Sequence, residues 1–387
     1  MRRRAFLRLG LGAAAWPAAL AAQDRPRGAR SVIWLWMAGG PSQGDTWDPK
    51  PGGAESIETP VAGLRISALL PRCAAQAGRL AIIRSMTVEL DTHEGATEMM
   101  HTGRVPYPRP AFGPVGTLLC AARRQDGAPA PRFISIEGPE VPTVDVFAAD
   151  DLPFRIRDVG APLPGPSLLE APARARLLAD LDAEWARTRP GAPSPGERAD
   201  RLLSSPMLRA FDAREEPEAL RKEYGGAFGR KCLVARRLVE AGCTFVEVGL
   251  GGWDTHRDHD ARVRALCAEL DPGMGTLVRD LADRGLLERT LVVCCGEFGR
   301  AREPNAEGGR EHWTRGFSAV LAGGTIQGGR VHGDTGPDGK DCRNPVPPGD
   351  FLATVWKACG AAGQKYHADG HTWTPVPHGA RPVASLF

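Results

Sequence analysis

The sequence predicts an α/β fold, a three-layer α/β/α sandwich whose mostly parallel central sheet is covered by helices on both faces. Short apolar runs with the length of buried strands, bounded by glycine-rich turns, alternate with helical patterns along the 387 residues. This alternation is typical of parallel sheets, because each crossover connection places a helix on one face. The 42% of residues that are hydrophobic supply enough apolar side chains for a core.

Five apolar runs are predicted to form strands, and helices are expected between them. The strands are expected at 31–37, 80–84, 243–250, Thr290–Cys295 and 317–322, and a weaker pattern at 133–137 indicates a sixth. Two segments, 230–241 and 275–284, carry apolar side chains at helical spacing. They stop at Gly242 and Gly285, and glycine commonly ends a helix because it adopts the left-handed conformation.

Residues 1–22 have the pattern of an export signal. Arg3 and Arg4 precede an apolar stretch at 9–20, as in twin-arginine signals, and that stretch is too short for a permanent bilayer anchor. This pattern predicts export by the twin-arginine route to the periplasm or the cell surface. An ordinary secretory signal or an uncleaved tether is the alternative.

The mature chain is expected to begin near Ala22 and to form a single domain over 23–387. Loop-rich insertions are expected around 104–172, where proline is frequent and periodicity is poor, and around 186–200. The rest of the chain has no apolar run as long as the roughly 18 residues of a membrane-spanning helix. No transmembrane anchoring is therefore expected after cleavage.

The charge of the mature chain excludes one class of partner. The formal net charge is +3, and the four arginines of residues 1–22, which contain no acid, leave −1 for the remainder. A nearly neutral body has no basic surface for nucleic acid, so no nucleic-acid partner is expected. The nine cysteines contain no Cys-x-x-Cys pair, and we interpret most of them as small buried apolar residues.

Polar and metal-capable side chains follow four of the predicted strands. The carboxyl ends of parallel strands share one edge of a sheet, and ligands bind at that edge, so these side chains are expected to lie close together. In chain order they are Asp45 and Asp48 after the first strand, His93 after the second, Asp254 and His256 after the third, and Glu297, Arg300, Arg310 and His312 after the fourth.

Carboxylate and imidazole groups without a thiolate motif suit Zn²⁺, Mn²⁺ or Fe better than Ca²⁺. Two such ions about 4 Å apart would clamp a phosphoryl or sulfuryl group, and Arg300 or Arg310 would hold its charged oxygens. Each motif alone also has a structural explanation. Asp254 would cap a helix, Glu297 would pair with an arginine, and His312 would be a packed histidine. The four remaining histidines in the C-terminal part, His332, His367, His371 and His378, are given no role.

Four segments resemble the exported family labelled domain of unknown function 1501. They read WLWMAGGPSQGDTWDPKPG, EAGCTFVEVGLGGWDTH, CGEFGRAREPNAEGGREHW and LAGGTIQGGRVHGDTG, and they occur in order from about residue 30 to the C-terminus. The family is grouped with the alkaline-phosphatase and sulfatase superfamily. The resemblance therefore implies an alkaline-phosphatase-like α/β/α sandwich with a site that depends on a divalent metal.

The resemblance also implies a ligand set. Glu297 is similar to the acidic ligand after a late strand, Asp254 and His256 to a central ligand pair, and His312 to a final histidine ligand. Asp45 would be the acidic ligand after the first strand, with Asp48 as the alternative. His93 would act as a ligand or as a proton shuttle.

This sequence departs from sulfatases at the nucleophile. Thr102-Gly103 is preceded at the expected distance by His93, and neither Cys, Ser nor Thr takes that place, although Thr92 and Thr97 are near. Phe298 also stands where many superfamily members have a second ligand. The resulting hypothesis is a metal-dependent hydrolase or transferase of phosphate or sulfate esters that binds a small anionic ester or a glycan-type ligand. The alternative is a catalytically silent binding or assembly protein that keeps the fold.

Overall fold

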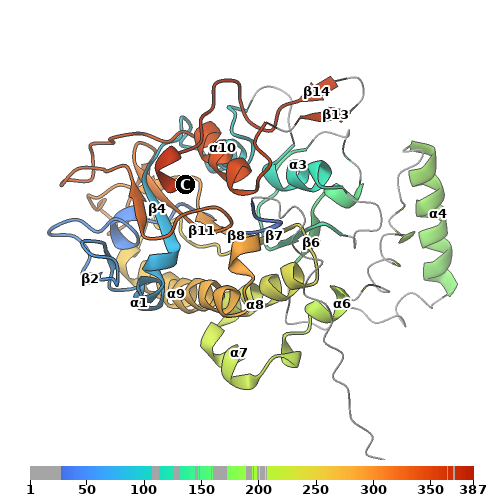
Figure 1. Ribbon diagram of the computed structural model, residues 1–387, viewed down its shortest axis with the longest axis horizontal. Helices are drawn as coiled ribbons and strands as arrows, with labels where there is room; N and C mark the ends of the chain where they lie inside the picture. Colours follow the sequence, from blue (N-terminus) through green and yellow to red (C-terminus); the bar gives the residue numbers. More distant parts are fainter. Residues whose placement is uncertain are drawn as a thin grey trace, which may run out of the picture.

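An eight-stranded sheet forms the centre of the computed structural model (Figure 1). The structure describes residues 28–106, 113–124, 131–143, 147, 149–157, 159, 172–188, 194, 196–197, 200, 205, 207–363, 365–368 and 371–387. The strands of the sheet are, in chain order, β1 (Ser31–Trp36), β4 (Leu80–Met86), β5 (Phe133–Ile136), β6 (Phe154–Ile156), β7 (Phe245–Gly249), β8 (Thr290–Cys295), β11 (Phe317–Gly323) and β12 (Arg330–His332).

One strand of this sheet runs against the others. The spatial order is β12-β4-β11-β8-β1-β7-β5-β6. Strand β11 pairs antiparallel with β4 and with β8, whereas the remaining neighbours pair parallel. The predicted mostly parallel sheet is therefore confirmed. Because β11 is reversed, its amino end lies at the same edge as the carboxyl ends of the other strands.

Helices cover both faces of the sheet, as predicted. Below the sheet in Figure 1 lie α1 (Pro71–Ala75), α7 (Glu218–Tyr224), α8 (Ala227–Glu240) and α9 (His259–Asp283), and on the other face lie α2 (His93–Thr102), α3 (Val115–Ala122) and α10 (Pro348–Ala358). Along β1, Ile33 and Leu35 join one apolar cluster, and Trp34 and Trp36 join the other. This period of two gives each face its own core, because successive side chains of a strand point to opposite faces.

Smaller elements lie outside the two main layers. They are the helices α4 (Pro172–Thr188) and α6 (Met207–Ala210) and the strand pairs β2 (Ser56–Glu58) with β3 (Arg65–Ser67), β9 (Gly299–Arg300) with β10 (His312–Trp313), and β13 (Tyr366–Ala368) with β14 (His371–Trp373). Within the described residues, no helix combines the length and apolar character that crossing a bilayer requires.

Helix α9 is much longer than the segment predicted at 275–284. It begins at His259 and continues through Pro272, Gly273 and Gly275, residues that normally argue against a helix interior. A Cβ at Gly273 would lie 2.8 Å from the Phe228 ring, and one at Gly275 would lie 2.8 Å from the Cβ of Arg72. The glycines therefore allow α8 and α1 to pack closely on α9, and this tertiary packing outweighs their low helix propensity.

The region around 104–172 contributes to the sheet instead of being wholly an excursion from it. Its described part contains α3, β5 and β6, and β5 pairs with β7. Strand β5 confirms the weaker pattern predicted at 133–137. The elements α3 and β6 were not predicted, because the proline-rich sequence around them breaks the periodic pattern on which sequence prediction depends. Residues 1–22 lie outside the described residues, as does most of 186–200.

A candidate metal centre at the carboxyl edge of the sheet

Three side chains from distant segments meet at the carboxyl edge of the sheet. His93 begins α2 after β4, Asp254 follows β7, and His312 lies on β10, just before the reversed strand β11. The reversal of β11 explains how a residue that precedes a strand reaches the edge where the other strands end. We call His93, Asp254 and His312 the ligand cluster.

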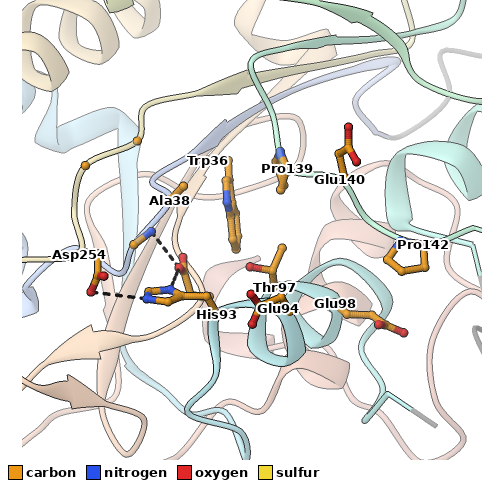
Figure 2. A pocket seen from close by; sticks show the side chains of 14 residues that line it. Trp36, Ala38, His93, Glu94, Thr97, Glu98, Pro139, Glu140, Pro142 and Asp254 are labelled. Atoms are coloured by element: carbon orange, nitrogen blue, oxygen red, sulfur yellow. Dashed lines mark hydrogen bonds and ion pairs between the residues drawn. The ribbon is translucent and has the colours of Figure 1, made fainter. Parts of the chain in front are cut away.

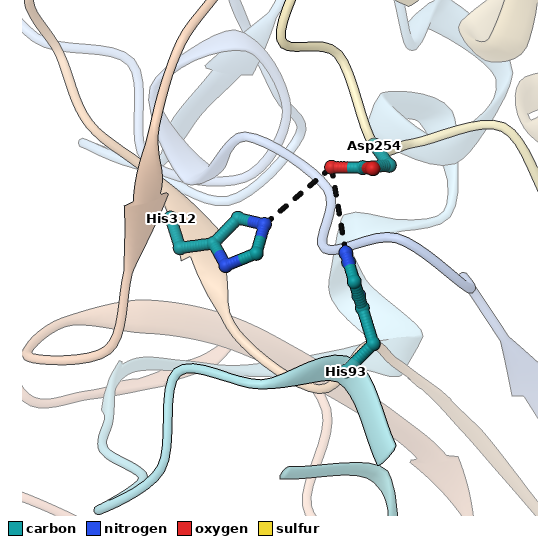
Figure 3. A group of neighbouring side chains, drawn as sticks. All are labelled: His93, Asp254 and His312. Atoms are coloured by element: carbon teal, nitrogen blue, oxygen red, sulfur yellow. Dashed lines mark ion pairs between the residues drawn. The ribbon is translucent and has the colours of Figure 1, made fainter. Parts of the chain in front are cut away.

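The ligand cluster brings three potential metal-binding atoms together (Figure 3). One ligand atom from each residue lies within 4.8 Å of the other two. Asp254 Oδ1 is 3.4 Å from His93 Nε2 and 3.5 Å from His312 Nε2. Metal–ligand bonds of about 2.0–2.1 Å in a tetrahedral site place ligand atoms roughly 3.3–3.4 Å apart. The residues present therefore fit a Zn²⁺-like ion in donor type, and both histidine–aspartate distances match its ligand spacing.

Glu297 fixes the orientation of His93. Its side chain is 2% exposed, and Oε1 accepts hydrogen bonds from the Gly39 N–H at 2.8 Å and from His93 Nδ1 at 2.7 Å. Because Glu297 accepts a hydrogen bond from Nδ1–H, the Nε2 atom of the neutral ring keeps its lone pair and is free to bind a metal. Glu297 Oε2 is buried without a hydrogen-bond partner, which is costly unless a cation or a ligand approaches it.

His312 is held in a similar way from the other side. Its Nδ1 lies 2.7 Å from the Asp91 carbonyl oxygen, which can only accept, so the neutral ring presents a free Nε2 lone pair. The imidazole stacks on Phe298 with 4.2 Å between the ring centroids. Phe298 thus takes the place expected for a second ligand and supports the first site with an apolar surface. This substitution favours one metal ion over two.

His256 lies beside the ligand cluster. Its Nε2 is 3.1 Å from Asp254 Oδ1 and 3.1 Å from His312 Nε2, and its Nδ1 is 3.1 Å from a Glu311 carboxylate oxygen. The Nε2 atom also faces Arg300 Nη1 at 3.4 Å. The group of described residues whose ligand atoms all lie within 4.8 Å of one another contains His93, Asp254 and His312 but not His256, so we do not count His256 in the cluster.

The local backbone explains why Asp254 reaches this position. Gly39 follows β1 with a φ of 109°, and a Cβ there would lie 2.3 Å from the Asp254 backbone nitrogen. Only glycine allows the two loops to approach this closely. Helix α2, which carries His93 at its first position, also ends at a glycine. Gly103 adopts the left-handed conformation and limits the helix to ten residues.

The pKa values in the cluster are shifted in the directions that its contacts require. The hydrogen bond with Glu297 raises the pKa of His93 above its usual value, although burial opposes the shift. Burial lowers the pKa of His312, which favours the neutral ring that binds metals. Burial raises the pKa of the Asp254 carboxyl, but the hydrogen bond and charge of Arg300 outweigh it, and the net shift is downward.

Arg300 is a positioning residue instead of a group that faces a ligand. Its side chain is 0% exposed, and Nε donates to the Gly40 carbonyl oxygen at 3.2 Å while Nη1 donates to the Arg310 carbonyl oxygen at 3.0 Å. Nη2 donates to the Gly39 carbonyl oxygen and, at 2.5 Å, to Asp254 Oδ1. These contacts connect three loops and leave the guanidinium no direction open toward a substrate.

Asp45 belongs to a second, closed group of side chains. Its Oδ2 contacts His259 Nε2 at 3.0 Å, Arg310 Nη1 at 3.2 Å and Ser42 Oγ at 2.5 Å. Burial raises the pKa of Asp45, but the hydrogen bond from His259 and the charge of Arg310 outweigh it, so the pKa lies below its usual value. We call Asp45, His259 and Arg310 the Asp45 cluster.

Asp48, the alternative to Asp45, is also committed to other contacts. It pairs with Lys50 at 2.9 Å and Arg84 at 3.3 Å, and it accepts a hydrogen bond from Thr335. Neither aspartate is in the group of potential ligands found among the described residues. Of the predicted ligands, Asp254 and His312 are therefore brought together, Glu297 and His256 adjoin them, and Asp45 lies in a separate cluster.

A cavity of about 510 Å³ opens beside the ligand cluster (Figure 2). His93, Asp254 and Glu297 form one side of it, and α2 supplies Glu94 and Thr97. Thr97 is the one hydroxyl-bearing side chain among the described lining residues. Sequence reasoning placed Thr97 near the nucleophile position but missed the structural role of His259. The only available signal for His259 was its closeness in sequence to His256.

A protein-family model matches most of this chain. The family model described as "Protein of unknown function (DUF1501)" matches residues 29–145 and 173–387. Among curated proteins, no sequence matches this chain.

Several solved structures have a similar fold, at low identity. A sulfatase from Pseudoalteromonas sp. is 17% identical over 87% of this chain and 68% of its own, with a TM-score of 0.42. A phosphonate monoester hydrolase from Silicibacter pomeroyi is 12% identical over 92% and 76%, with a TM-score of 0.35. The alkaline phosphatase TAB5, in a mutant form with bound Mg, is 11% identical over 79% and 94%, with a TM-score of 0.36.

Proposed function

We propose that this chain, which belongs to the family of unknown function 1501, is an exported metal-dependent hydrolase or transferase of phosphate or sulfate esters. One observation carries the proposal: His93, Asp254 and His312 place three ligand atoms within 4.8 Å of one another beside an open cavity. Export to the periplasm or the cell surface is proposed from the twin-arginine pattern of residues 1–22.

The number of ligands supports a catalytic role for the metal. Structural zinc sites are closed by four protein ligands, whereas catalytic sites have three and keep one position for water or substrate. His93, Asp254 and His312 would hold the ion, and Glu297 would keep His93 in the metal-binding tautomer. When bound, such an ion supplies Lewis acidity toward an ester oxygen and lowers the pKa of water.

His256 is the side chain best placed to move a proton. Its ring is 39% exposed, it adjoins Asp254 and His312, and Glu311 holds its Nδ1. In hydrolysis, a water oxygen forms a bond to phosphorus or sulfur, the bond to the alcohol oxygen breaks, and the water proton ends on the alcohol. A histidine in contact with both the ligand cluster and solvent suits this transfer.

Metal analysis and an ester assay test the proposal together. We expect the purified chain to hold a divalent metal and to cleave members of a panel of chromogenic phosphate and sulfate mono- and diesters. Asp254→Asn and His312→Ala should lose both the metal and the turnover. His378→Ala is the matched control, because His378 is exposed and lies outside the site. Protein without a metal after reconstitution would contradict the site itself.

The silent alternative rests on a specific observation. Both candidate arginines are committed, Arg300 to Asp254 and the loop carbonyls and Arg310 to Asp45. No Lys or Arg is among the described residues that line the cavity. A binding or assembly protein that keeps one metal would have this arrangement. Metal retained in the wild type with no turnover of any ester would favour this alternative over catalysis.

A further inference from the structure

A chain of buried polar contacts ties α2 to the sheet. His101 Nε2 on α2 is 2.9 Å from Glu247 Oε1 on β7, and both side chains are buried. Ser135 Oγ on β5 donates to the other carboxylate oxygen of Glu247 at 3.0 Å. The His101 ring also packs against Trp34 and Trp36 of β1, with 5.5 and 4.6 Å between the ring centroids. We call His101, Glu247 and Ser135 the polar bridge.

The elements that the polar bridge joins also build the walls of the cavity. Helix α2 supplies His93 and Thr97, the segment after β5 supplies Pro139, and the loop after β7 supplies Asp254 (Figure 2). Two members of the ligand cluster, His93 and Asp254, therefore follow from the positions of α2 and β7. Their separation depends on how α2 lies on β7.

The polar bridge and His93 lie along the same side of α2. His93, Thr97 and His101 occupy positions i, i+4 and i+8 of the helix. His93 contacts Glu297 at the first residue of α2, and His101 contacts Glu247 eight residues later. Two polar contacts at separate points along a helix fix both its rotation and its axial position, because movement about one contact displaces the other.

Apolar packing alone specifies this arrangement less sharply. The buried apolar side chains of α2 are Ala96, Met99 and Met100. Methionine is unbranched and flexible, so it adapts to more than one packing arrangement. A shift of α2 that these methionines accommodate would leave Glu247 in the interior without its partner, which is strongly unfavourable. The polar bridge thus selects one orientation of α2.

Both ring nitrogens of His101 are engaged. Nδ1 is 2.7 Å from the Thr97 carbonyl oxygen, which can only accept, so Nδ1 carries a proton. A lone pair on Nε2 would not bond to a carboxylate lone pair at 2.9 Å, so one further proton lies between Nε2 and Glu247 Oε1. The Nε2 atoms of His93 and His312, by contrast, are free. His101 is therefore suited to position other residues and not to bind a metal.

We propose that the polar bridge positions α2 so that His93 faces Asp254 and His312 at the spacing that a metal requires. This inference rests on the proposed function, because it concerns the affinity of the same site for its metal. A buried pair of this kind adds little net stability, since the loss of hydration offsets the attraction between its members. The polar bridge should therefore matter more for metal binding than for unfolding.

Zinc competition with a chromogenic chelator and urea unfolding of the metal-free chain test this distinction. The apolar variant His101→Leu, Glu247→Met, Ser135→Ala removes the polar bridge without opening a large cavity. Its urea midpoint should equal or exceed that of the wild type, because apolar replacement of a buried pair is often neutral or stabilising. Its zinc affinity should fall by about tenfold, as for other residues that orient a metal ligand. A purely structural role predicts lower stability with unchanged zinc affinity.

A conservative variant and a control sharpen the test. In Glu247→Gln the amide N–H donates to the Nε2 lone pair of neutral His101, so zinc affinity should stay within about twofold of the wild type. The control Tyr224→Phe removes a buried hydrogen bond of 2.9 Å to Asp280 and should leave zinc affinity unchanged, because Tyr224 packs on the opposite face of the sheet. Wild-type zinc affinity in the folded apolar variant, or a tenfold loss in Glu247→Gln, would overturn the proposal.

A measurement on the wild type decides the matter if the apolar variant does not fold. Coupling is reciprocal, so zinc must strengthen the polar bridge by the factor by which the bridge strengthens zinc binding. The proton between His101 and Glu247 exchanges with water only when the bridge opens. By proton NMR this exchange should slow by about tenfold at saturating zinc, and loss of the signal in Glu247→Gln assigns it. An unchanged exchange rate would overturn the coupling.

The ester assay separates this inference from the proposed function. The expected changes in zinc affinity without turnover of any ester would support the polar bridge and contradict hydrolysis. Turnover by the wild type, together with full zinc affinity in the folded apolar variant, would support hydrolysis and overturn the role of the polar bridge. A wild type that binds no zinc would overturn both.

Discussion

The ligand cluster and the Asp45 cluster lie at the same edge of the sheet and contain the same kinds of side chain, but they differ in how many lone pairs are free. In the Asp45 cluster, Asp45 is paired with His259 and Arg310. In the ligand cluster, each histidine uses Nδ1 to hold its position and leaves Nε2 facing Asp254.

This difference shows what separates a binding site from a structural ion pair. Residue type does not separate them, because both clusters contain an aspartate and histidine. An arginine also pairs with the aspartate of each cluster, and the deciding property is whether histidine Nε2 lone pairs stay free beside it. Arg310 pairs with Asp45, and the charge of the Asp45 cluster is balanced inside the protein. In the ligand cluster Arg300 pairs with Asp254, but the Nε2 atoms of His93 and His312 still face Asp254, and His93 also lines the open cavity.

Among the substitutions, Asp254→Asn is expected to change metal affinity most, because it removes the anionic member of the ligand cluster. Metal affinity should fall by more than about 100-fold, because a neutral amide is a much weaker ligand than a carboxylate. Metal competition with a chromogenic chelator measures the change. If Asp254→Asn binds metal as tightly as the wild type, the two clusters do not differ in the way described.

The second-largest loss of metal affinity is expected from Glu297→Gln, which keeps the shape of the side chain but removes the charge that orients His93. Removal of a carboxylate behind a histidine ligand typically weakens metal binding by about 10- to 100-fold. The same chelator titration applies. Glu55→Gln, at an exposed position outside the site, is the control and should leave the affinity unchanged.

Asp45→Asn should have the opposite pattern, with lower stability and unchanged metal binding. The substitution leaves Arg310 and His259 without their buried counter-charge, and the free energy of unfolding should fall by about 2 kcal/mol. Urea unfolding measures this loss. A large loss of metal affinity in a folded Asp45→Asn protein would show that Asp45 is a ligand after all.

The smallest expected effect is a change with pH in the contribution of Asp45 to the free energy of unfolding. Because the folded pKa of Asp45 lies below its value of about 3.9 in an unfolded chain, its ionised form stabilises the fold. This contribution is present above the unfolded pKa and is lost as the pH falls through the folded pKa. The difference in unfolding free energy between the wild type and Asp45→Asn should therefore be constant near neutral pH and shrink below about pH 4. A difference that stays constant down to pH 2 would contradict the proposed ionisation of Asp45.

The main elements of the fold were predictable because their patterns are strong and local. Residues 290–295 are apolar and bounded by turns, and they form β8 as predicted. The carboxyl edge of a parallel sheet then predicts that Asp254 and Glu297 lie near each other. His93 was predicted as a ligand or a proton shuttle, and the Nδ1 contact with Glu297 favours the ligand role.

Other features depend on contacts that a sequence does not encode locally. Whether Arg300 faces a substrate or the interior depends on three loops that meet only in the folded chain. The buried pair of His101 and Glu247, 2.9 Å apart, joins α2 to β7 and was also missed. Its one signal was Glu247 itself, a charged residue in an otherwise apolar strand.

The position of β1 in the sheet has a consequence for biosynthesis. It pairs Val32 with Phe245 on one side and with Leu291 on the other, more than 200 residues later in the chain. A growing polypeptide therefore exposes this tryptophan-containing apolar strand until most of the protein has left the ribosome. Such non-local pairing slows folding and favours aggregation of the nascent chain. Protection of this segment by a chaperone would benefit the yield of native protein.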